Sequence, residues 1–524
     1  MEQAFELLAI SALLLASAML SVCTSSVHLR IMGKAVFEFS RSNSCPAFWA
    51  ALATNFGTKC LATIGMCVLR GGPGVLPWMV LTGGVAGTCL KYYEVCHVSW
   101  CFADQSECGC NGRGERDDNL SDVVEDGEDG SLIRPGPGHF YSTAFGPRMG
   151  RLATLFFALS SCACAIDSSV FPKVSQSFGR LTFGLLEPDL RCALLILLVV
   201  FLPVHGGVRA VGNCCQVLHV DLLLPAMCWV GVCALARYGE RFPATLGSLW
   251  IGFTRPEVLG YSQFDVILQG SRAGLCAAAV GTGHTSLIYG RKTPKVLALA
   301  DVWARVLACS FVAFLIILAG QVPVDCRQHF PPRFDSGAKV VEATLVLFLE
   351  GHGFRAMEGI VLSLIRFVMN FCHLLGAMLN GALAISLFED ELGLPRLDAV
   401  LGLVACAVYW QGAQKRAESV AQALSLCGSL LSLLSAVAFA FHALWHLRDP
   451  HLRRAARAGS PSAVACAGAA SAAAPASAGD SRGASSAGGG LGRPGGSRCG
   501  GGGRGGGAAA AGVGSAPKGQ DKRR

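Results

Sequence analysis

The short run Gly281-Thr282-Gly283-His284 lies inside a long apolar stretch and contains side chains that could bind an ion or a small solute. Threonine and histidine offer oxygen and nitrogen atoms to an ion or a small solute, and a histidine titrates near neutral pH. The two glycines weaken the helix and have no Cβ to block a close approach. Two structures fit this pattern. Either the helix is broken and lines a binding site, or small residues pack tightly between neighbouring helices.

His284 raises the question of proton coupling, because imidazole changes charge in the physiological range. A single histidine that is hydrogen-bonded inside a helix bundle is the commoner explanation of such a residue. The sequence leaves both explanations open.

The elements around this run are those of a membrane protein. Of the 524 residues, 52% are hydrophobic and 15% are charged, whereas soluble proteins carry about 25% charged residues. Apolar runs close to the length of a bilayer crossing recur along the chain. We therefore predict an all-α, polytopic transmembrane helix bundle. Its expected spans lie at about 5–23, 46–70, 75–95, 187–205, 217–237, 261–289, 297–320, 359–388, 398–412 and 418–446, with 150–170 a weaker candidate.

A long polar loop over residues 96–149 interrupts these runs. It holds an acidic stretch, a group of cysteines and the glycosylation sequence that begins at Asn119. Clustered cysteines beside such a sequence favour the extracellular side, where disulfides persist. The loop lies outside if residues 46–95 form one long, interrupted crossing, and inside if they form two crossings and 150–170 does not cross. We prefer the first arrangement.

The composition changes to Gly, Ala, Ser and Arg beyond about residue 447. Such a segment cannot bury enough apolar surface to offset the entropy lost on ordering. We therefore expect a transmembrane domain over residues 1–446 and a disordered cytoplasmic tail over residues 447–524. The net charge of +8 partly reflects this tail, and it is a topology signal rather than a sign of nucleic-acid binding. The chain shows no nucleophile motif, phosphate loop or metal-ligand spacing, so we expect no enzyme, no catalytic residues and no metal site.

Several short stretches, in the right order, resemble the sodium- and chloride-dependent neurotransmitter symporter family. Residues 206–230 resemble the family's cytoplasmic turn and fifth span, and residues 309–320 and 367–393 resemble its seventh and eighth spans. Residues 279–288, "AVGTGHTSLI", resemble the family's Ser-Leu-Gly-x-Gly-Phe-Gly-x-Leu-Ile in the sixth span. The resemblance covers roughly residues 1–446 and rests on order and spacing, since no single motif is intact.

This resemblance implies a secondary transporter that moves a small amino-acid-like or amine solute across the plasma membrane by alternating access. The sixth-span equivalent would be discontinuous, broken at Gly281 and Gly283. The loop would carry a disulfide between Cys101 and Cys110, with glycosylation at Asn119. The residues implied to line the solute and ion pathway are Gln269, Ala279, Gly281, Thr282, Gly283, His284 and Gly376.

The sequence departs from the family where sodium would bind. Ala279 stands in place of a serine, Val306 in place of an asparagine, and Met378-Leu379 in place of an Asp-Ser pair. Sodium requires oxygen ligands, so the sodium and chloride that the resemblance implies lack part of their site. The chain also begins at a stretch that resembles the family's second span, and the first span has no counterpart in it.

These departures give an alternative function: a transport-incompetent relative that acts as a membrane scaffold or partner subunit, or a truncated gene product. The expected partners are the lipid bilayer and a small-molecule solute, and no cofactor other than the two ions is implied. Whether the chain forms a homo- or hetero-oligomer stays open.

Overall fold

The computed structural model describes residues 2–23, 45–95, 147–167, 169–279, 284–289, 296–320, 336–349, 355–392 and 397–413, with Val437, Ala440 and Leu444. Several predicted features lie outside these residues: the Cys101–Cys110 disulfide, the Asn119 glycosylation site, the tail over 447–524, and Gly281, Thr282 and Gly283.

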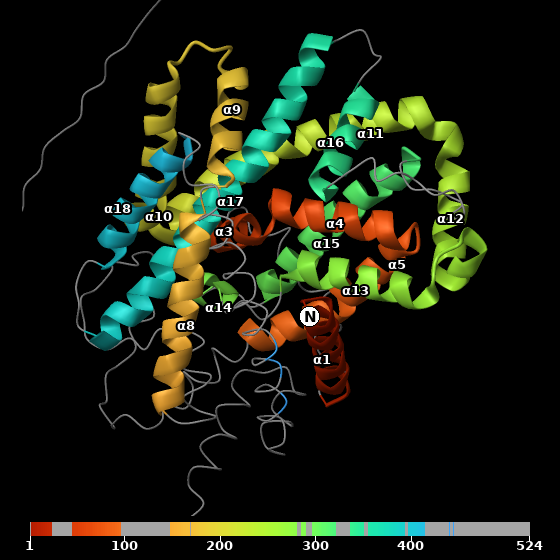
Figure 1. The fold of residues 1–524 in the computed structure, drawn as a ribbon, viewed down its shortest axis with the longest axis horizontal. Helices are drawn as coiled ribbons and strands as arrows, with labels where there is room; N and C mark the ends of the chain where they lie inside the picture. Colours follow the sequence, from red (N-terminus) through yellow and green to blue (C-terminus); the bar gives the residue numbers. More distant parts are fainter. Residues whose placement is uncertain are drawn as a thin grey trace, which may run out of the picture. The chain divides into compact units, whose positions relative to one another are not determined.

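Every regular element among the described residues is a helix, which confirms the all-α prediction (Figure 1). A helical stretch over residues 88–95 follows η1 directly. The elements are α1 (Glu2–Cys23), α3 (Pro46–Asn55), α4 (Thr58–Gly71), α5 (Val75–Leu81), η1 (Thr82–Gly87), α8 (Pro147–Ile166), α9 (Phe171–Leu181), α10 (Pro188–Val217), η2 (Leu218–Leu223), α11 (Leu224–Tyr238), η3 (Gly239–Arg241), α12 (Phe242–Thr254), η4 (Pro256–Leu259), α13 (Gln263–Ala278), α14 (His284–Tyr289), α15 (Val296–Leu318), α16 (Gly337–Leu349), α17 (Arg355–Leu392) and α18 (Leu397–Ala413).

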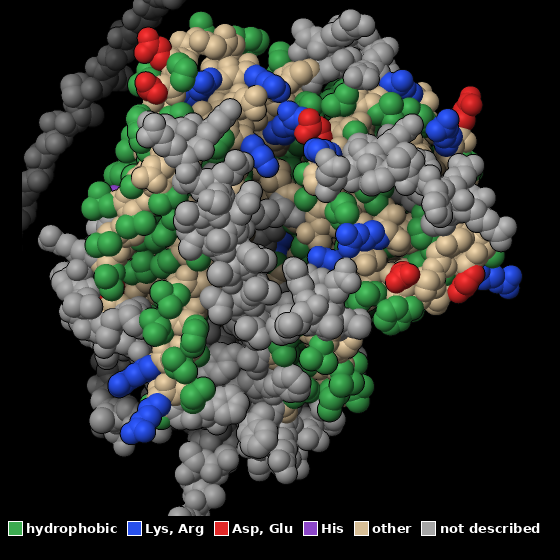
Figure 2. Space-filling model, viewed as in Figure 1, with side chains coloured by type: hydrophobic (Ala, Val, Ile, Leu, Met, Phe, Trp, Pro, Cys, Tyr) green, Lys and Arg blue, Asp and Glu red, His purple; other side chains and the backbone are tan. Residues whose placement is uncertain are grey.

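Four helical stretches of the described chain are long and apolar enough to cross a bilayer: 147–181, 188–254, 297–318 and 359–387. The second of them exposes much of its apolar surface, including Leu197, Phe201, Trp229 and Trp250. Figure 2 shows hydrophobic side chains over much of the described surface on one face, with Lys and Arg gathered mainly in its upper part. Soluble monomers rarely expose such large apolar patches, so this surface supports a membrane protein.

The described bundle contains two groups of closely packed helices. The long helix α17 packs against α3, α8, α9 and α10, and Figure 1 shows it running diagonally beside α8 and α9. The other group centres on α13, which packs against α4, α5, η1 and α15. The predicted run over 46–70 is two helices, α3 and α4, because the helix stops at Asn55 and restarts at Thr58.

Close contact between α13 and η1 depends on small residues. The η1 sequence, Thr-Gly-Gly-Val-Ala-Gly, forms a π-helix, a wide form that often marks functional sites. The hydroxyl of Thr82 donates to the Trp78 carbonyl at 2.8 Å and lies 3.4 Å from the Gly270 carbonyl oxygen of α13, across the contact. A Cβ added to Gly274 would lie 2.7 Å from both the Gly83 nitrogen and the Met79 carbonyl oxygen. Backbone atoms cannot yield as a flexible side chain can, so only glycine fits at position 274.

We predict that Gly274→Ala lowers the free energy of unfolding by about 1–3 kcal/mol, because the added methyl group collides with backbone. The matched control is Gly247→Ala on α12, where an added Cβ meets nothing within 4 Å. Thermal unfolding of both variants in lipid nanodiscs provides the measurement. Equal unfolding temperatures for the two variants would contradict this account of the helix contact.

Candidate functional site

The apolar stretch that contains the Gly-Thr-Gly run is not one continuous α-helix. Helix α13 ends at Ala278, and Ala279 adopts the left-handed conformation, with φ 45° and ψ 53°. The Ala279 N–H closes the helix by donating to the Leu275 carbonyl at 3.0 Å. Helix α14 begins at His284. A left-handed alanine costs roughly 1–2 kcal/mol, so the surrounding contacts must stabilise this turn.

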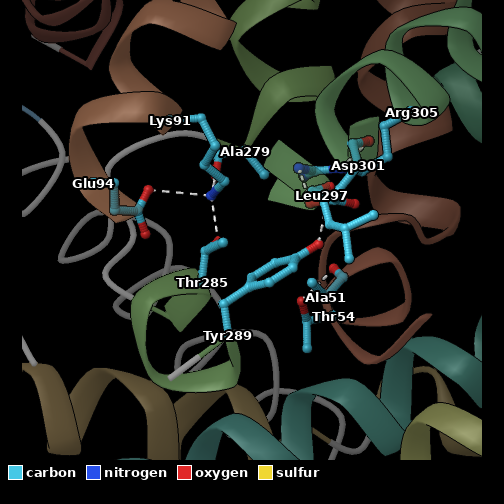
Figure 3. A network of polar contacts seen from close by, with 10 residues as sticks. All are labelled: Ala51, Thr54, Lys91, Glu94, Ala279, Thr285, Tyr289, Leu297, Asp301 and Arg305. Carbon is cyan, nitrogen blue, oxygen red and sulfur yellow. Dashed lines mark hydrogen bonds and ion pairs between the residues drawn. The ribbon is translucent and has the colours of Figure 1, made fainter. Parts of the chain in front are cut away.

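The side chain of Lys91 reaches the carbonyl end of α13. Its Nζ donates to the Ala279 carbonyl oxygen at 3.0 Å, to Glu94 Oε2 at 3.1 Å and to the Thr285 hydroxyl (Figure 3). Lys91, Glu94 and Thr285 are all fully buried. The last carbonyls of a helix have no partner within it and carry partial negative charge, so an ammonium group is favourable there.

The contact between η1 and α13 sets the position of Lys91. A Cβ added to Gly87 would lie 2.4 Å from the Cβ of Ala278, so the end of η1 packs directly on the last residue of α13. Residues 88–95 continue from this point, and Lys91 lies one helical turn further on. The close contact at Gly87 therefore brings the Lys91 ammonium within reach of the Ala279 carbonyl.

A second charged pair, Asp301 and Arg305, lies on α15. Arg305 Nη2 donates to Asp301 Oδ2 at 2.7 Å, and both side chains are fully buried. Asp301 Oδ1 and Arg305 Nη1 have no hydrogen-bond partner among the described residues. Figure 3 shows this pair in the same network of polar contacts as Lys91 and Glu94, so the two pairs form one group of two acids and two bases. We name Lys91, Glu94, Asp301 and Arg305 the charged cluster.

The structure brings some of the predicted pathway residues to this cluster. Ala279 takes part through its carbonyl oxygen. His284 is buried at the first position of α14, its ring 4.9 Å from that of Phe157, and its Nδ1 has no hydrogen-bond partner among the described residues. Its role in proton coupling stays a prediction.

The other two described candidates lie elsewhere. Gln269 lies about three turns before Ala279 on the same helix, and its buried Oε1 has no partner among the described residues. Gly376 lies on α17, where an added Cβ would be 2.5 Å from the Cα of Thr54 in α3. This contact gives Gly376 a packing role, and its part in a solute pathway stays a prediction.

Sequence reasoning missed Lys91, Glu94 and Arg305. A signal was present, because ionisable residues within apolar spans are rare and mark ion or solute pathways by default. Lys91 and Glu94 are three residues apart, and Asp301 and Arg305 are four apart, which are the spacings that place side chains side by side on a helix. The structure buries Asp301 on α15 and pairs it with Arg305.

The apolar residues that the symporter resemblance aligns with sodium ligands are part of the protein interior. Val306, Met378 and Leu379 are fully buried in the main hydrophobic core. Their side chains carry no oxygen atoms, so they offer nothing to a hard cation. Among the described residues, no group of three or more His, Cys, Asp or Glu side chains is arranged to hold a metal ion.

No protein-family model matches this chain, and a search of curated proteins finds no significant match. The symporter resemblance therefore rests on the order of the short motifs alone.

We predict that Asp301→Leu destabilises the protein by about 3–5 kcal/mol, because it leaves the Arg305 charge buried without its partner. The double variant Asp301→Leu/Arg305→Met should recover most of this loss, since apolar residues of similar size often replace a buried pair without a net cost. Unfolding in nanodiscs measures both effects. A double variant no more stable than Asp301→Leu would contradict the pairing.

Proposed function

We propose that this protein is a multi-pass secondary transporter that moves a small amino-acid-like or amine solute across the plasma membrane by alternating access. The observation that best supports the proposal is the charged cluster beside the end of α13. Charged groups cost several kcal/mol each to remove from water, and membrane proteins keep them chiefly along ion and solute pathways. A helix that ends inside an apolar stretch adds backbone groups to the same place.

The chemistry of the Asp301–Arg305 pair supports a solute of this class. The pair offers one carboxylate oxygen and one guanidinium nitrogen that have no partner among the described residues. An amino acid carries an ammonium group and a carboxylate group, so it can satisfy both atoms at once. Both residues are buried, so the described conformation is closed over them, and a solute reaches them only after the helices move.

The test is uptake into liposomes that contain the purified protein, with a panel of radiolabelled amino acids and amines. We expect saturable uptake of at least one amino acid. Arg305→Gln should reduce amino-acid uptake at least tenfold but reduce the uptake of amines without a carboxylate much less, because Arg305 Nη1 would bind the carboxylate. Lys173→Ala, at an exposed position on α9, is the control. Absence of saturable uptake across the whole panel would count against a transporter.

A second function, that of a membrane scaffold or partner subunit without transport activity, is favoured by the core packing of Val306, Met378 and Leu379. Such a protein would show no uptake and would copurify with another membrane protein from its native membrane. Sodium-driven uptake by the chain would exclude it.

A further inference from the structure

The environment of the Lys91 ammonium group has the composition of a cation site. Its three acceptors are a main-chain carbonyl oxygen from Ala279, a carboxylate oxygen from Glu94 and a hydroxyl oxygen from Thr285. Carbonyl, carboxylate and hydroxyl oxygens are the ligands that hard metal cations take from proteins. They come from three segments, residues 88–95, the end of α13 and the start of α14, so the ammonium joins parts of the chain that are far apart in sequence.

The charges around this group also favour a cation. Glu94 is fully buried, and the Ala279 carbonyl belongs to the negative end of the α13 dipole. Arg305 is paired with Asp301 at 2.7 Å, so its charge is already matched within that pair. Removal of the ammonium takes away the positive charge that lies 3.1 Å from the buried Glu94 carboxylate.

We propose that Lys91 is a built-in cation: its ammonium group fills a site that would otherwise bind a monovalent metal ion. The wild-type protein then binds no sodium or potassium ion between Ala279, Thr285 and Glu94, and removal of the lysine side chain turns this place into an alkali-cation site. This claim concerns binding alone and holds for a transporter and for a scaffold. If the protein does transport a solute, a fixed ammonium removes this site as a source of sodium coupling.

Two variants separate the loss of charge from the opening of space. Lys91→Ala removes the ammonium and leaves room among the oxygen atoms. Lys91→Met removes the ammonium but fills the same room with an apolar chain of similar length. A third variant, Lys91→Ala/Glu94→Gln, keeps the room and removes the carboxylate charge. The proposal predicts cation binding by the first variant only.

The experiment measures binding of radioactive sodium ions to each purified protein in detergent, and thermal unfolding in sodium, potassium or choline chloride at constant ionic strength. We expect Lys91→Ala to bind one more sodium ion per chain than the wild type and to unfold at a higher temperature in sodium or potassium chloride than in choline chloride. The wild type should show neither change at this site. Lys173→Ala should behave as the wild type does.

Two results would overturn the proposal. One is a folded Lys91→Ala protein that binds no more sodium or potassium than the wild type. The other is an equal gain of binding by Lys91→Met or by Lys91→Ala/Glu94→Gln, which would place the new ion elsewhere. If Lys91→Ala does not fold, Lys91→Ser leaves room and keeps a small polar side chain, and the same comparisons decide the question.

Discussion

The site depends on one constraint: the carbonyl oxygen at the buried end of a helix must accept a hydrogen bond. Helix α13 ends at Ala278 inside an apolar stretch, and the carbonyl oxygen of its C-cap residue, Ala279, requires a donor. The Lys91 ammonium supplies that donor and in turn needs negative charge close by, which Glu94 provides at 3.1 Å. Neither the helix end nor the charge is stable there alone, because each would leave a polar group buried without a partner. The break and the charged cluster therefore depend on each other.

The packing of small residues makes this arrangement possible. The glycines of η1 and α13 allow main chains to come into direct contact, and this contact places residues 88–95 against the end of α13. Larger side chains would separate these elements and move the ammonium away from its acceptors. The close contacts within the apolar bundle therefore determine where the Lys91 charge lies. The exposed apolar faces of α10, α11 and α12 suit a lipid environment.

Much of the fold follows from local sequence, and most of the site does not. Each predicted apolar run that lies within the described residues forms helix, because a helix in an apolar environment satisfies its own backbone hydrogen bonds. The sequence did not predict helices α9, α12 and α16, because their 11, 13 and 13 residues are too few to cross a bilayer. The glycines at 281 and 283 pointed to a weak helix, and the helix ends just before them, at Ala278. The partners of Lys91 could not be predicted, since Ala279 and Thr285 are 188 and 194 residues away along the chain and meet it only through tertiary packing.

The central claim is that an ion pair with Glu94 stabilises the Lys91 ammonium at the end of α13, and a double-mutant cycle tests it most directly. The cycle compares the wild type, Lys91→Met, Glu94→Gln and the double variant by unfolding in nanodiscs. A stabilising coupling energy of at least about 1 kcal/mol between the two side chains is expected for charges in contact inside the protein. A coupling energy of zero, with the two single losses simply adding, would contradict the account.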